Sequence, residues 1–319
     1  MTNPSLKIWA NVNYPEPVIN LLREGTSGHE LILTPGREDA LIYPREADVA
    51  FGQPSVEIIL RSPRISWIHL DSAGYDKFDD EEIKSTLLSR GAVLTTSSTV
   101  FSEPCAQHLL AMIMSLARRL PQAYASQLSD RSWPMWNLRE QSFLLTGQTA
   151  LLLGFGAISR RLSELLAPLR MNLIAVRRRP TGDEPVHAIG EAEIKKHLLL
   201  ADHVINILPA NAGTHHFINS ELIAAMKPGA IFYNIGRGVT VDQDALFKAL
   251  KVGHLAAAYL DVTEPEPLPP EHPLWTAPNC FISPHTAGGH IGEKERLVRH
   301  FLDNLRRFVN KNDLLDRVI

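Results

Sequence analysis

One stretch of the sequence, residues 150–159, limits the possible folds of this chain more than any other. It opens with an apolar run typical of a buried parallel strand, and the residues after it carry apolar side chains at helical spacing. A side chain at Gly154 would block the tight turn between them, and one at Gly156 would hold the backbone away from a pyrophosphate. The pattern predicts a strand, a turn and a helix whose first residues, Ala157 and Ile158, bind the phosphates of a dinucleotide.

The end of the next predicted strand, 172–176, indicates which dinucleotide. Arg177, Arg178 and Arg179 follow it, where a site for NAD would place an acid for the ribose 2′-hydroxyl. Guanidinium groups bind phosphate through paired hydrogen bonds, so the cluster favours the 2′-phosphate of NADP. NAD stays the alternative, because a run of arginines also occurs in solvated turns that bind no phosphate. Ser159 replaces the third glycine of the fingerprint and weakens the match.

Composition excludes several classes of function. The 319 residues suffice for two domains, and a net charge of −3 offers no basic field for nucleic acid or for an anionic membrane. No apolar run reaches the length that spans a bilayer. Cys105 and Cys280 have neither CxxC nor metal-ligand spacing. We therefore expect no metal site and a reducing, cytoplasmic location.

The first hundred residues alternate short apolar strands with amphipathic helices, which is the pattern of an α/β layer fold. Ser72, Ala73 and Gly74 directly follow one of these strands. Small residues there leave backbone N–H groups exposed at the strand ends where open α/β sheets bind ligands. The strands predicted in this part are residues 6–12, 31–34, 49–51, 67–70 and 93–95.

The rest of the chain continues the alternation and predicts a six-stranded nucleotide domain. Residues 103–120 show the longest apolar helix pattern, which Pro121 is expected to end. Residues 129–140, with Trp133 and Trp136, show no period and are predicted as a loop. The six predicted strands are residues 150–153, 172–176, 202–208, 230–234, 256–261 and 281–283.

Three strand ends in this second part carry chemistry-bearing residues. Arg237 lies between two glycines after one strand, the run 261–267 contains several acids after the next, and His285 follows the last. The carboxyl ends of parallel strands share one sheet edge. An arginine, an acid and a histidine gathered there could bind a carboxylate, orient the histidine and donate a proton, as reduction of a keto acid requires.

Taken together, these motifs resemble the D-isomer-specific 2-hydroxyacid dehydrogenase family over nearly the whole chain. The resemblance implies an α/β fold of two doubly wound domains, Rossmann-like and flavodoxin-like, with a nucleotide domain (102–289) inserted in a substrate domain (1–101 and 290–319). It also implies a homodimer formed through the nucleotide domain. The motifs that carry it are residues 72–74, 154–159, 206–209, 234–238, 261–269, 273–275 and 283–288.

The resemblance assigns roles to individual residues. Arg237 matches the arginine that binds the substrate carboxylate and polarises the keto oxygen, and His285 matches the general acid–base. Glu266 matches the glutamate that hydrogen-bonds this histidine and favours the imidazolium form. Ala73 and Gly74 match backbone donors to the substrate carboxylate.

Cofactor contacts follow from the glycine turn, the arginine cluster and the resemblance together. Asp261 matches the acid that holds the nicotinamide amide, whereas Gln107 departs from a family glutamate on the helix that joins the domains. The expected cofactor-binding residues are Gly154, Gly156, Ala157, Ile158, Arg177, Arg178, Pro209 and Asp261.

The expected activity is reduction of a small 2-oxo acid, such as glyoxylate or hydroxypyruvate, to the D-2-hydroxy acid by hydride transfer from NADP(H). Related formate dehydrogenases carry glutamine where Glu266 stands, which argues against formate. Two alternatives stay open. One, within the family, is a phosphoglycerate or phosphite dehydrogenase, and the other is a cofactor-sensing scaffold like the family's corepressors.

Overall fold

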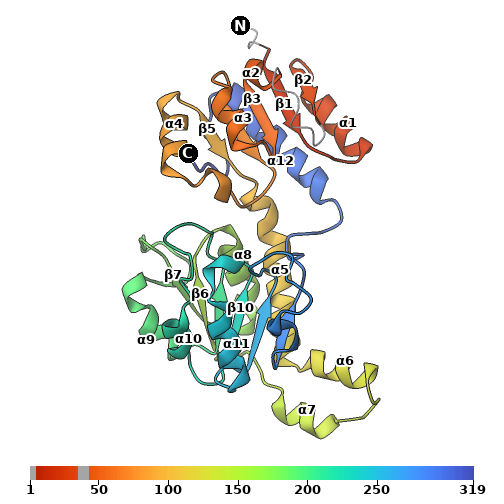
Figure 1. Ribbon diagram of the computed structural model, residues 1–319, viewed down its shortest axis with the longest axis vertical. Helices are drawn as coiled ribbons and strands as arrows, with labels where there is room; N and C mark the ends of the chain where they lie inside the picture. The colour runs from red at the N-terminus through yellow and green to blue at the C-terminus, as the bar shows by residue number, and fades with distance from the viewer. Residues whose placement is uncertain (1–4, 35–42) are drawn as a thin grey trace. The chain divides into compact units, whose positions relative to one another are not determined.

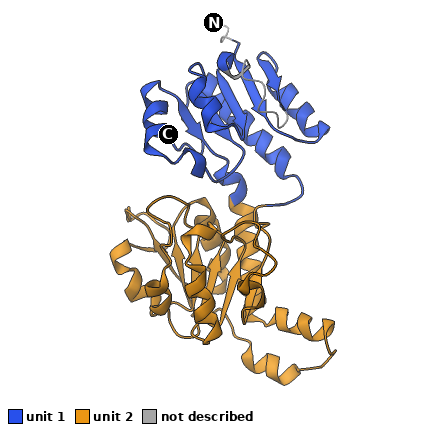
Figure 2. Cartoon of the chain, viewed as in Figure 1, with its two compact units in different colours: residues 1–101, 289–319 blue, residues 102–288 orange. Residues whose placement is uncertain are grey.

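The computed structural model describes residues 5–34 and 43–319, and the chain divides into two compact units (Figure 2). Unit 1 comprises residues 1–101 and 289–319, and unit 2 comprises residues 102–288. The chain leaves unit 1 within helix α5 (Ser98–Ala117) and returns to it at residue 289. Unit 2 is therefore an insertion in the sequence of unit 1.

Unit 1 is built on five parallel strands in the order β2-β1-β3-β4-β5, the flavodoxin-like order (Figure 1). All five predicted strands are present: β1 (Lys7–Asn11), β2 (Glu30–Leu33), β3 (Val49–Gly52), β4 (Trp67–Leu70) and β5 (Val93–Thr95). The helices of this unit are α1 (Glu16–Gly25), α2 (Tyr43–Glu46), α3 (Val56–Arg61), α4 (Glu81–Ser89) and α12 (Glu293–Val309), with the short 3-10 helix η1 (Asp76–Phe78).

Helix α12 joins the end of the chain to the core of unit 1. The ring of Phe301, on this helix, stacks on the rings of Phe51 and Trp67, with ring centroids 4.2 and 5.3 Å away. Leu297, Val298 and Phe301 are fully buried on the same face of the helix, whose other face is charged. Burying large apolar side chains stabilises a fold by about 1.5–3 kcal/mol each. The last helix is therefore part of the first domain's core.

Unit 2 holds a seven-stranded parallel sheet in the order β12-β11-β10-β9-β6-β7-β8. The strand order reverses between β6 and β9, which is the point where doubly wound sheets bind ligands. The strands are β6 (Thr149–Leu153), β7 (Asn172–Val176), β8 (His187–Ile189), β9 (His203–Asn206), β10 (Ile231–Asn234), β11 (Ala257–Leu260) and β12 (Cys280–Ile282). Its helices include α8 (Ala157–Leu166), α9 (Ile194–Leu198), α10 (Ser220–Ala224) and α11 (Gln243–Lys251), with the 3-10 helices η2 (Ala167–Leu169), η3 (Glu191–Glu193), η4 (Gly238–Thr240) and η5 (Pro273–Thr276).

The prediction of six strands in this part was wrong by one, because β8 was missed. This strand has only three residues at the edge of the sheet, paired with β7 from His187 to Ile189. Three residues are too few to show alternation, and one of them is a histidine. Pairing with β7, rather than local pattern, makes this segment a strand.

Two helices between α5 and β6 were also missed. Helix α5 ends at Ala117, and Arg119, with φ +54, is the N-cap of a new helix, α6 (Leu120–Leu128). Pro121 therefore lies in the first turn of α6 and does not end the previous helix. Within the predicted loop 129–140 a further helix, α7 (Met135–Gln141), begins. No residue of α6 or α7 is buried. Without a buried face neither helix has the periodic apolar pattern that identifies a helix in a sequence.

Helix α5 carries the glutamine that departs from the family pattern. Gln107 Nε2 donates a hydrogen bond to Glu103, and Glu103 accepts from Arg161 of α8. A glutamate at position 107 would put a second carboxylate beside Glu103. The glutamine thus fits an acid–arginine link between α5 and α8. Over residues 5–34 and 43–319, no helix is long and apolar enough to cross a bilayer.

Candidate active site

The glycine turn joins β6 to α8 at the carboxyl edge of the sheet in unit 2. Gly154 has φ +94, which favours glycine, and a Cβ there would lie 3.3 Å from the carbonyl oxygen of Ile207. A Cβ on Gly156 would meet no protein atom within 4 Å. The space beside Gly156 is open, at the helix N-terminus that begins with Ala157 and Ile158. This geometry fits the pyrophosphate of a dinucleotide.

Ser159 takes the place of the third glycine without separating helix and strand. The residue is fully buried, and its hydroxyl donates a hydrogen bond to the carbonyl oxygen of Gly154 at 2.6 Å. The side chain therefore links α8 to the turn. Ser159 therefore allows the same close packing of helix and strand that a glycine at this position allows.

A cavity of about 280 Å³ opens beside the turn. Arg177 and Arg178, at the end of β7, both line it. Glu191 also lines it. The other lining residues come from the ends of β6 and β7, from the glycine turn and from the loop after β9: Leu153, Gly154, Phe155, Gly156, Val176, Leu208, Pro209, Gly213, Thr214 and Phe217. The structure thus brings most of the predicted cofactor-binding residues to one cavity.

An acid that the sequence pattern did not single out pairs with Arg177. Glu184 Oε1 lies 2.6 Å from Arg177 Nη1, and the glutamate side chain is only 1% exposed. The backbone N–H of Thr181 and the Arg177 guanidinium hold the pKa of the Glu184 carboxyl well below its usual range, although burial opposes them. Both hydrogen bonds that Arg177 donates through its side chain, to Glu184 and Thr181, use Nη1. Among the described residues, Nε and Nη2 of Arg177 donate no hydrogen bond, so both are available for a phosphate.

Buried amides hold together the ends of β9 and β10. Asn206 Nδ2 donates to Asn234 Oδ1 at 3.0 Å and to Thr240 Oγ1 at 2.7 Å. Asn234 Oδ1 also accepts the backbone N–H of Gly236 at 3.1 Å. All three side chains of this network are buried. The network fixes the loop in which Arg237 lies.

The glycines on either side of Arg237 allow very close backbone contacts. A Cβ on Gly236 would lie 2.5 Å from the carbonyl oxygen of Leu208, and one on Gly238 would lie 1.9 Å from that of Thr263. Only a residue without a side chain fits at either position. The Arg237 loop is therefore packed between the loops that follow β9 and β11, and Arg237 Nη1 donates to the Gly236 carbonyl at 2.8 Å.

His285 and Glu266 form a hydrogen-bonded pair. His285 Nδ1 lies 2.8 Å from Glu266 Oε2, and the second carboxylate oxygen accepts the backbone N–H of Thr263 at 3.1 Å. Because Nδ1 faces the carboxylate, Nε2 is the nitrogen left to meet a substrate. The histidine side chain is 53% exposed, and its backbone has φ +52, a region uncommon for residues other than glycine. Such backbone strain is found at functional sites.

Asp261 organises the loop that carries His285. Its carboxylate accepts the N–H groups of Thr286 and Ala287, both at 2.9 Å, and the hydroxyl of Ser283. Its backbone carbonyl accepts the N–H of His285 at 2.8 Å. The residue is 2% exposed. Asp261 thus holds the unusual backbone of His285, a task that the sequence did not indicate.

A chain of buried and half-buried polar groups continues from Asp261. The hydroxyl of Tyr259 contacts His108 Nε2, Ser283 Oγ and, at 3.4 Å, Asp261 Oδ1. Tyr259 lies on β11 and His108 on α5. Neither residue was singled out from the sequence, because a tyrosine in a buried strand and a histidine on a helix give no local sign that they meet.

We expect Tyr259→Phe to lower both stability and turnover. The change removes the Tyr259 hydroxyl that bonds His108 Nε2, which costs about 1–3 kcal/mol of unfolding free energy. Ser283 Oγ keeps its bond to Asp261 but loses its contact with Tyr259, which loosens the support of the His285 loop. Thermal unfolding and kcat measure the two effects. Tyr233→Phe is the matched control, because its buried hydroxyl bonds His203 Nδ1 at 3.1 Å instead. Equal kcat values in the two variants would contradict a link between Tyr259 and the site.

Ala73 and Gly74 belong to unit 1, in the turn after β4. The hydroxyl of Ser72 donates to the carbonyl oxygen of Gly74 at 2.7 Å, and Asp71 is held by Tyr14 and Gln53. Within the described ranges the backbone N–H groups of Ala73 and Gly74 donate no hydrogen bond to the protein. Both are therefore available to a ligand.

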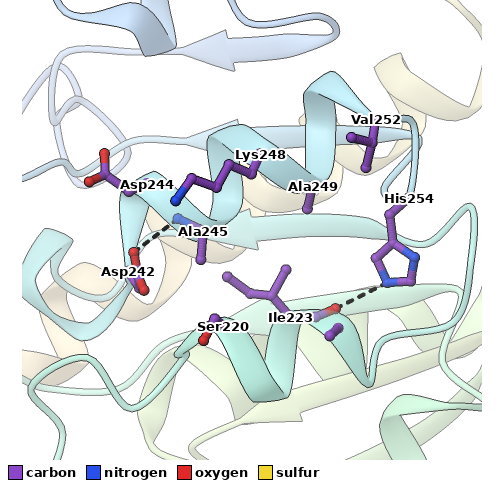
Figure 3. A pocket seen from close by; sticks show the side chains of 10 residues that line it. Ser220, Ile223, Asp242, Asp244, Ala245, Lys248, Ala249, Val252 and His254 are labelled. Carbon is purple, nitrogen blue, oxygen red and sulfur yellow. Dashed lines mark hydrogen bonds between the residues drawn. The ribbon is translucent and has the colours of Figure 1, made fainter.

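A larger groove, of about 660 Å³, lies between α10 and α11 (Figure 3). Asp242 and Lys248 line it, but Asp242 accepts the N–H of Ala245 as a helix cap and His254 Nε2 faces the carbonyl oxygen of Ile223. These polar groups stabilise the two helices. The groove holds none of the residues at the strand ends, so its size does not make it the candidate active site.

Comparison with known proteins identifies the family. Residues 110–287 match the model described as D-isomer specific 2-hydroxyacid dehydrogenase, NAD binding domain. The chain is 31% identical to glyoxylate/hydroxypyruvate reductase B of Klebsiella pneumoniae over 265 residues, which cover 80% of this chain and 78% of that protein. It is 29% identical to glyoxylate reductase of Thermofilum pendens over 311 residues, 94% and 90% of the two chains.

A solved structure agrees with these matches. The NADPH-dependent glyoxylate/hydroxypyruvate reductase of Sinorhizobium meliloti, in complex with NADP and malonate, is 27% identical and superimposes with a TM-score of 0.77 over 99% of this chain and 97% of that one. The resemblance inferred from the motifs and the predicted fold class are both confirmed. The chain belongs to the D-isomer specific 2-hydroxyacid dehydrogenase family.

Proposed function

We propose that this oxidoreductase reduces a small 2-oxo acid to the D-2-hydroxy acid with NADPH. The observation that carries the proposal is the His285–Glu266 pair, 2.8 Å apart at the end of a sheet that also holds the glycine turn. A histidine oriented by a carboxylate is suited to exchange a proton with a substrate oxygen. Glyoxylate and hydroxypyruvate are the first candidates, since curated relatives carry these names.

The residues of the glycine turn fit a nicotinamide dinucleotide. Gly156 leaves open space at the start of α8 for the pyrophosphate, and Pro209 lines the same cavity. Among the described residues, Asp261 Oδ2 accepts only the N–H of Ala287, and we assign the remaining lone pair of this oxygen to the nicotinamide amide. When bound, this cofactor supplies the hydride for the carbonyl carbon.

The chain's own residues supply binding and the proton. We assign His285 Nε2–H as the donor to the carbonyl oxygen, which becomes the hydroxyl of the product while Glu266 holds the ring through Nδ1. The guanidinium of Arg237 binds the substrate carboxylate and stabilises the developing charge on the carbonyl oxygen. The N–H groups of Ala73 and Gly74 are further proposed donors to a substrate carboxylate, as the family resemblance implies.

A substrate screen tests the proposed function. Initial rates of absorbance loss at the reduced-nicotinamide band are measured with glyoxylate, hydroxypyruvate, pyruvate and phenylpyruvate, each with NADPH and with NADH. We expect turnover with the two smallest acids and faster turnover with NADPH. Turnover with NADH alone would support the proposed reduction of a 2-oxo acid but contradict NADPH as the cofactor. Tight cofactor binding without turnover of any acid would contradict the reaction and favour a cofactor-sensing scaffold.

The preference for NADPH is expected to depend on Arg177. Its Nε and Nη2 face no protein acceptor in the described ranges, and losing charge-assisted hydrogen bonds to a 2′-phosphate costs about 1.5–3 kcal/mol. Arg177→Ala should therefore lower the ratio of kcat/KM for NADPH over NADH by roughly 10- to 100-fold. Arg179→Ala is the control, since Arg179 does not line the cavity. The same ratio in wild type and Arg177→Ala would contradict the assignment.

We also propose that two copies of the chain pair through α6 and α7, which extend away from the sheet of unit 2 (Figure 1). Large apolar side chains on this segment are exposed: Tyr124 by 64%, Leu128 by 84%, Trp133 by 88% and Trp136 by 64%. Exposed apolar patches of this kind mark protein interfaces, where tryptophan and tyrosine are enriched. A second copy of the chain would bury them.

Light scattering after size exclusion measures this pairing. We expect the wild type to have twice the 35.5 kDa mass of one chain. The double variant with Leu128→Glu and Trp133→Glu should have the mass of one chain. Leu88→Glu is the control, because Leu88 is a similarly exposed leucine (60%) on α4 of unit 1. A monomeric wild type, or a dimer that survives both changes in the segment, would overturn the proposed interface.

The cysteines support a location in the cytoplasm. Cys105 and Cys280 are both free, and burial raises the pKa of each thiol to about 12. Thiols that stay protonated at neutral pH are unreactive, and free thiols are typical of reducing compartments.

A further inference from the structure

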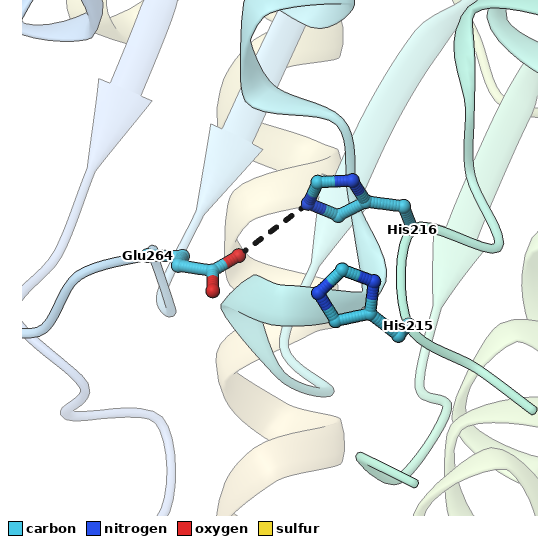
Figure 4. Close-up of side chains that lie close together, drawn as sticks. All are labelled: His215, His216 and Glu264. Atoms are coloured by element: carbon cyan, nitrogen blue, oxygen red, sulfur yellow. Dashed lines mark ion pairs between the residues drawn. The ribbon is translucent and has the colours of Figure 1, made fainter. Parts of the chain in front are cut away.

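Three potential metal ligands lie together outside the proposed active-site residues (Figure 4). His215 and His216 belong to the loop after β9, and Glu264 belongs to the loop after β11. Their ligand atoms all lie within 4.8 Å of one another, and His216 Nε2 is 3.6 Å from Glu264 Oε2. The fold thus gathers residues that are far apart in the sequence.

The backbone around the three residues is well anchored. The N–H of His216 donates to the carbonyl oxygen of Val239 at 2.8 Å, and the N–H of Glu264 donates to Gln243 Oε1 at 3.1 Å. His216 has φ +46, which is uncommon for residues other than glycine. In this conformation the rings of His215 and His216 stack, with centroids 4.2 Å apart and planes at 26°. A ring nitrogen of each imidazole lies within 4.8 Å of a carboxylate oxygen of Glu264.

We propose that His215, His216 and Glu264 bind a divalent transition-metal ion of the zinc type. Two imidazoles and a carboxylate form one of the ligand sets that zinc uses, with a water at the fourth position. Tetrahedral geometry with bonds of about 2.0–2.2 Å requires ligand atoms about 3.3 Å apart. The ligand atoms now lie within 4.8 Å of one another, and rotations of the side chains about their χ angles would bring them to that spacing. Both histidines are exposed, so the ion enters directly from solvent.

Such an ion would join the loop after β9 to the loop after β11. Both loops lie at the edge of the sheet where the cofactor cavity and the His285–Glu266 pair are found. An ion that binds the folded chain and not the unfolded one raises the unfolding temperature. The site therefore predicts stabilisation by metal, a readout that does not depend on any enzymatic activity.

The test uses the full chain without a histidine tag, freed of metal with EDTA and dialysed. Isothermal titration with zinc chloride near pH 7.5 should show one high-affinity ion per chain, and zinc should raise the unfolding midpoint. His216→Asn and Glu264→Gln should each weaken zinc binding by roughly tenfold or more. Asparagine suits position 216 because it tolerates the left-handed backbone conformation.

His187→Ala is the matched control, since His187 is an exposed histidine on β8 outside the cluster. It should keep wild-type zinc affinity. Metal-free unfolding midpoints equal to that of the wild type show that the variants are folded. Zinc affinity unchanged in both His216→Asn and Glu264→Gln, or no zinc binding by the wild type, would overturn the proposed site.

Discussion

Replacing His285 with glutamine is expected to lower kcat by on the order of a thousandfold, within the usual range for loss of a general acid. Glutamine cannot deliver a proton in the way that an imidazolium does, so hydride transfer to the carbonyl carbon would leave an uncompensated alkoxide. The side chain is 53% exposed, so the fold should not depend on it. Stopped-flow reduction of glyoxylate measures kcat, and fluorescence titration with NADPH measures cofactor affinity, which should stay unchanged.

Glu266→Gln tests the same pair with a milder change than His285→Gln. Glutamine keeps an oxygen that can accept from His285 Nδ1 but removes the negative charge 2.8 Å away. We expect a smaller loss of kcat, on the order of tenfold to a hundredfold. If His285→Gln retained a tenth or more of wild-type turnover, His285 would not be the proton donor.

Replacing Gly238 with alanine is expected to destabilise unit 2 by about 3 kcal/mol or more, the upper range for an overpacked site. The new Cβ would lie 1.9 Å from the carbonyl oxygen and 2.0 Å from the carbonyl carbon of Thr263. These atoms are backbone and cannot rotate away. The loops after β10 and β11 would have to separate, which displaces Arg237 as well. Thermal unfolding should shift down by roughly 6–12 °C, and turnover should fall at temperatures where the variant is folded.

Gly190→Ala is the control for the effect of an added methyl group. Gly190 has φ −81, and a Cβ there would meet no protein atom within 4 Å. Its unfolding temperature should stay within about 1–2 °C of wild type, because surface changes of this kind stay near 0.5 kcal/mol. Equal unfolding temperatures for Gly238→Ala and wild type would show that the two loops are not in contact.

The sequence identified the parts of the site that depend on local geometry. Gly154 and Gly156 indicate a turn at which a side chain is not tolerated. Buried parallel strands are recognisable in the sequence as continuous apolar runs. Each predicted strand is present, and the fold class and family inferred from these motifs are confirmed. Arg237, His285 and the acidic run 261–267 were noticed because they follow strands, and strand ends of one parallel sheet meet at one edge. The family resemblance then singled out Glu266 from this run. Their roles stay predictions.

Only the tertiary structure decided which groups meet across the fold. Glu184 pairs with Arg177, Tyr259 contacts His108, and Asp261 holds the His285 loop through contacts that no local pattern encodes. The strand β8 and the helices α6 and α7 were missed because short or unburied elements lack a periodic apolar signal. Local pattern specifies backbone conformation, because propensity and turn sterics act between neighbours in sequence. Hydrogen bonds and charge pairs between distant residues arise only when packing brings them together.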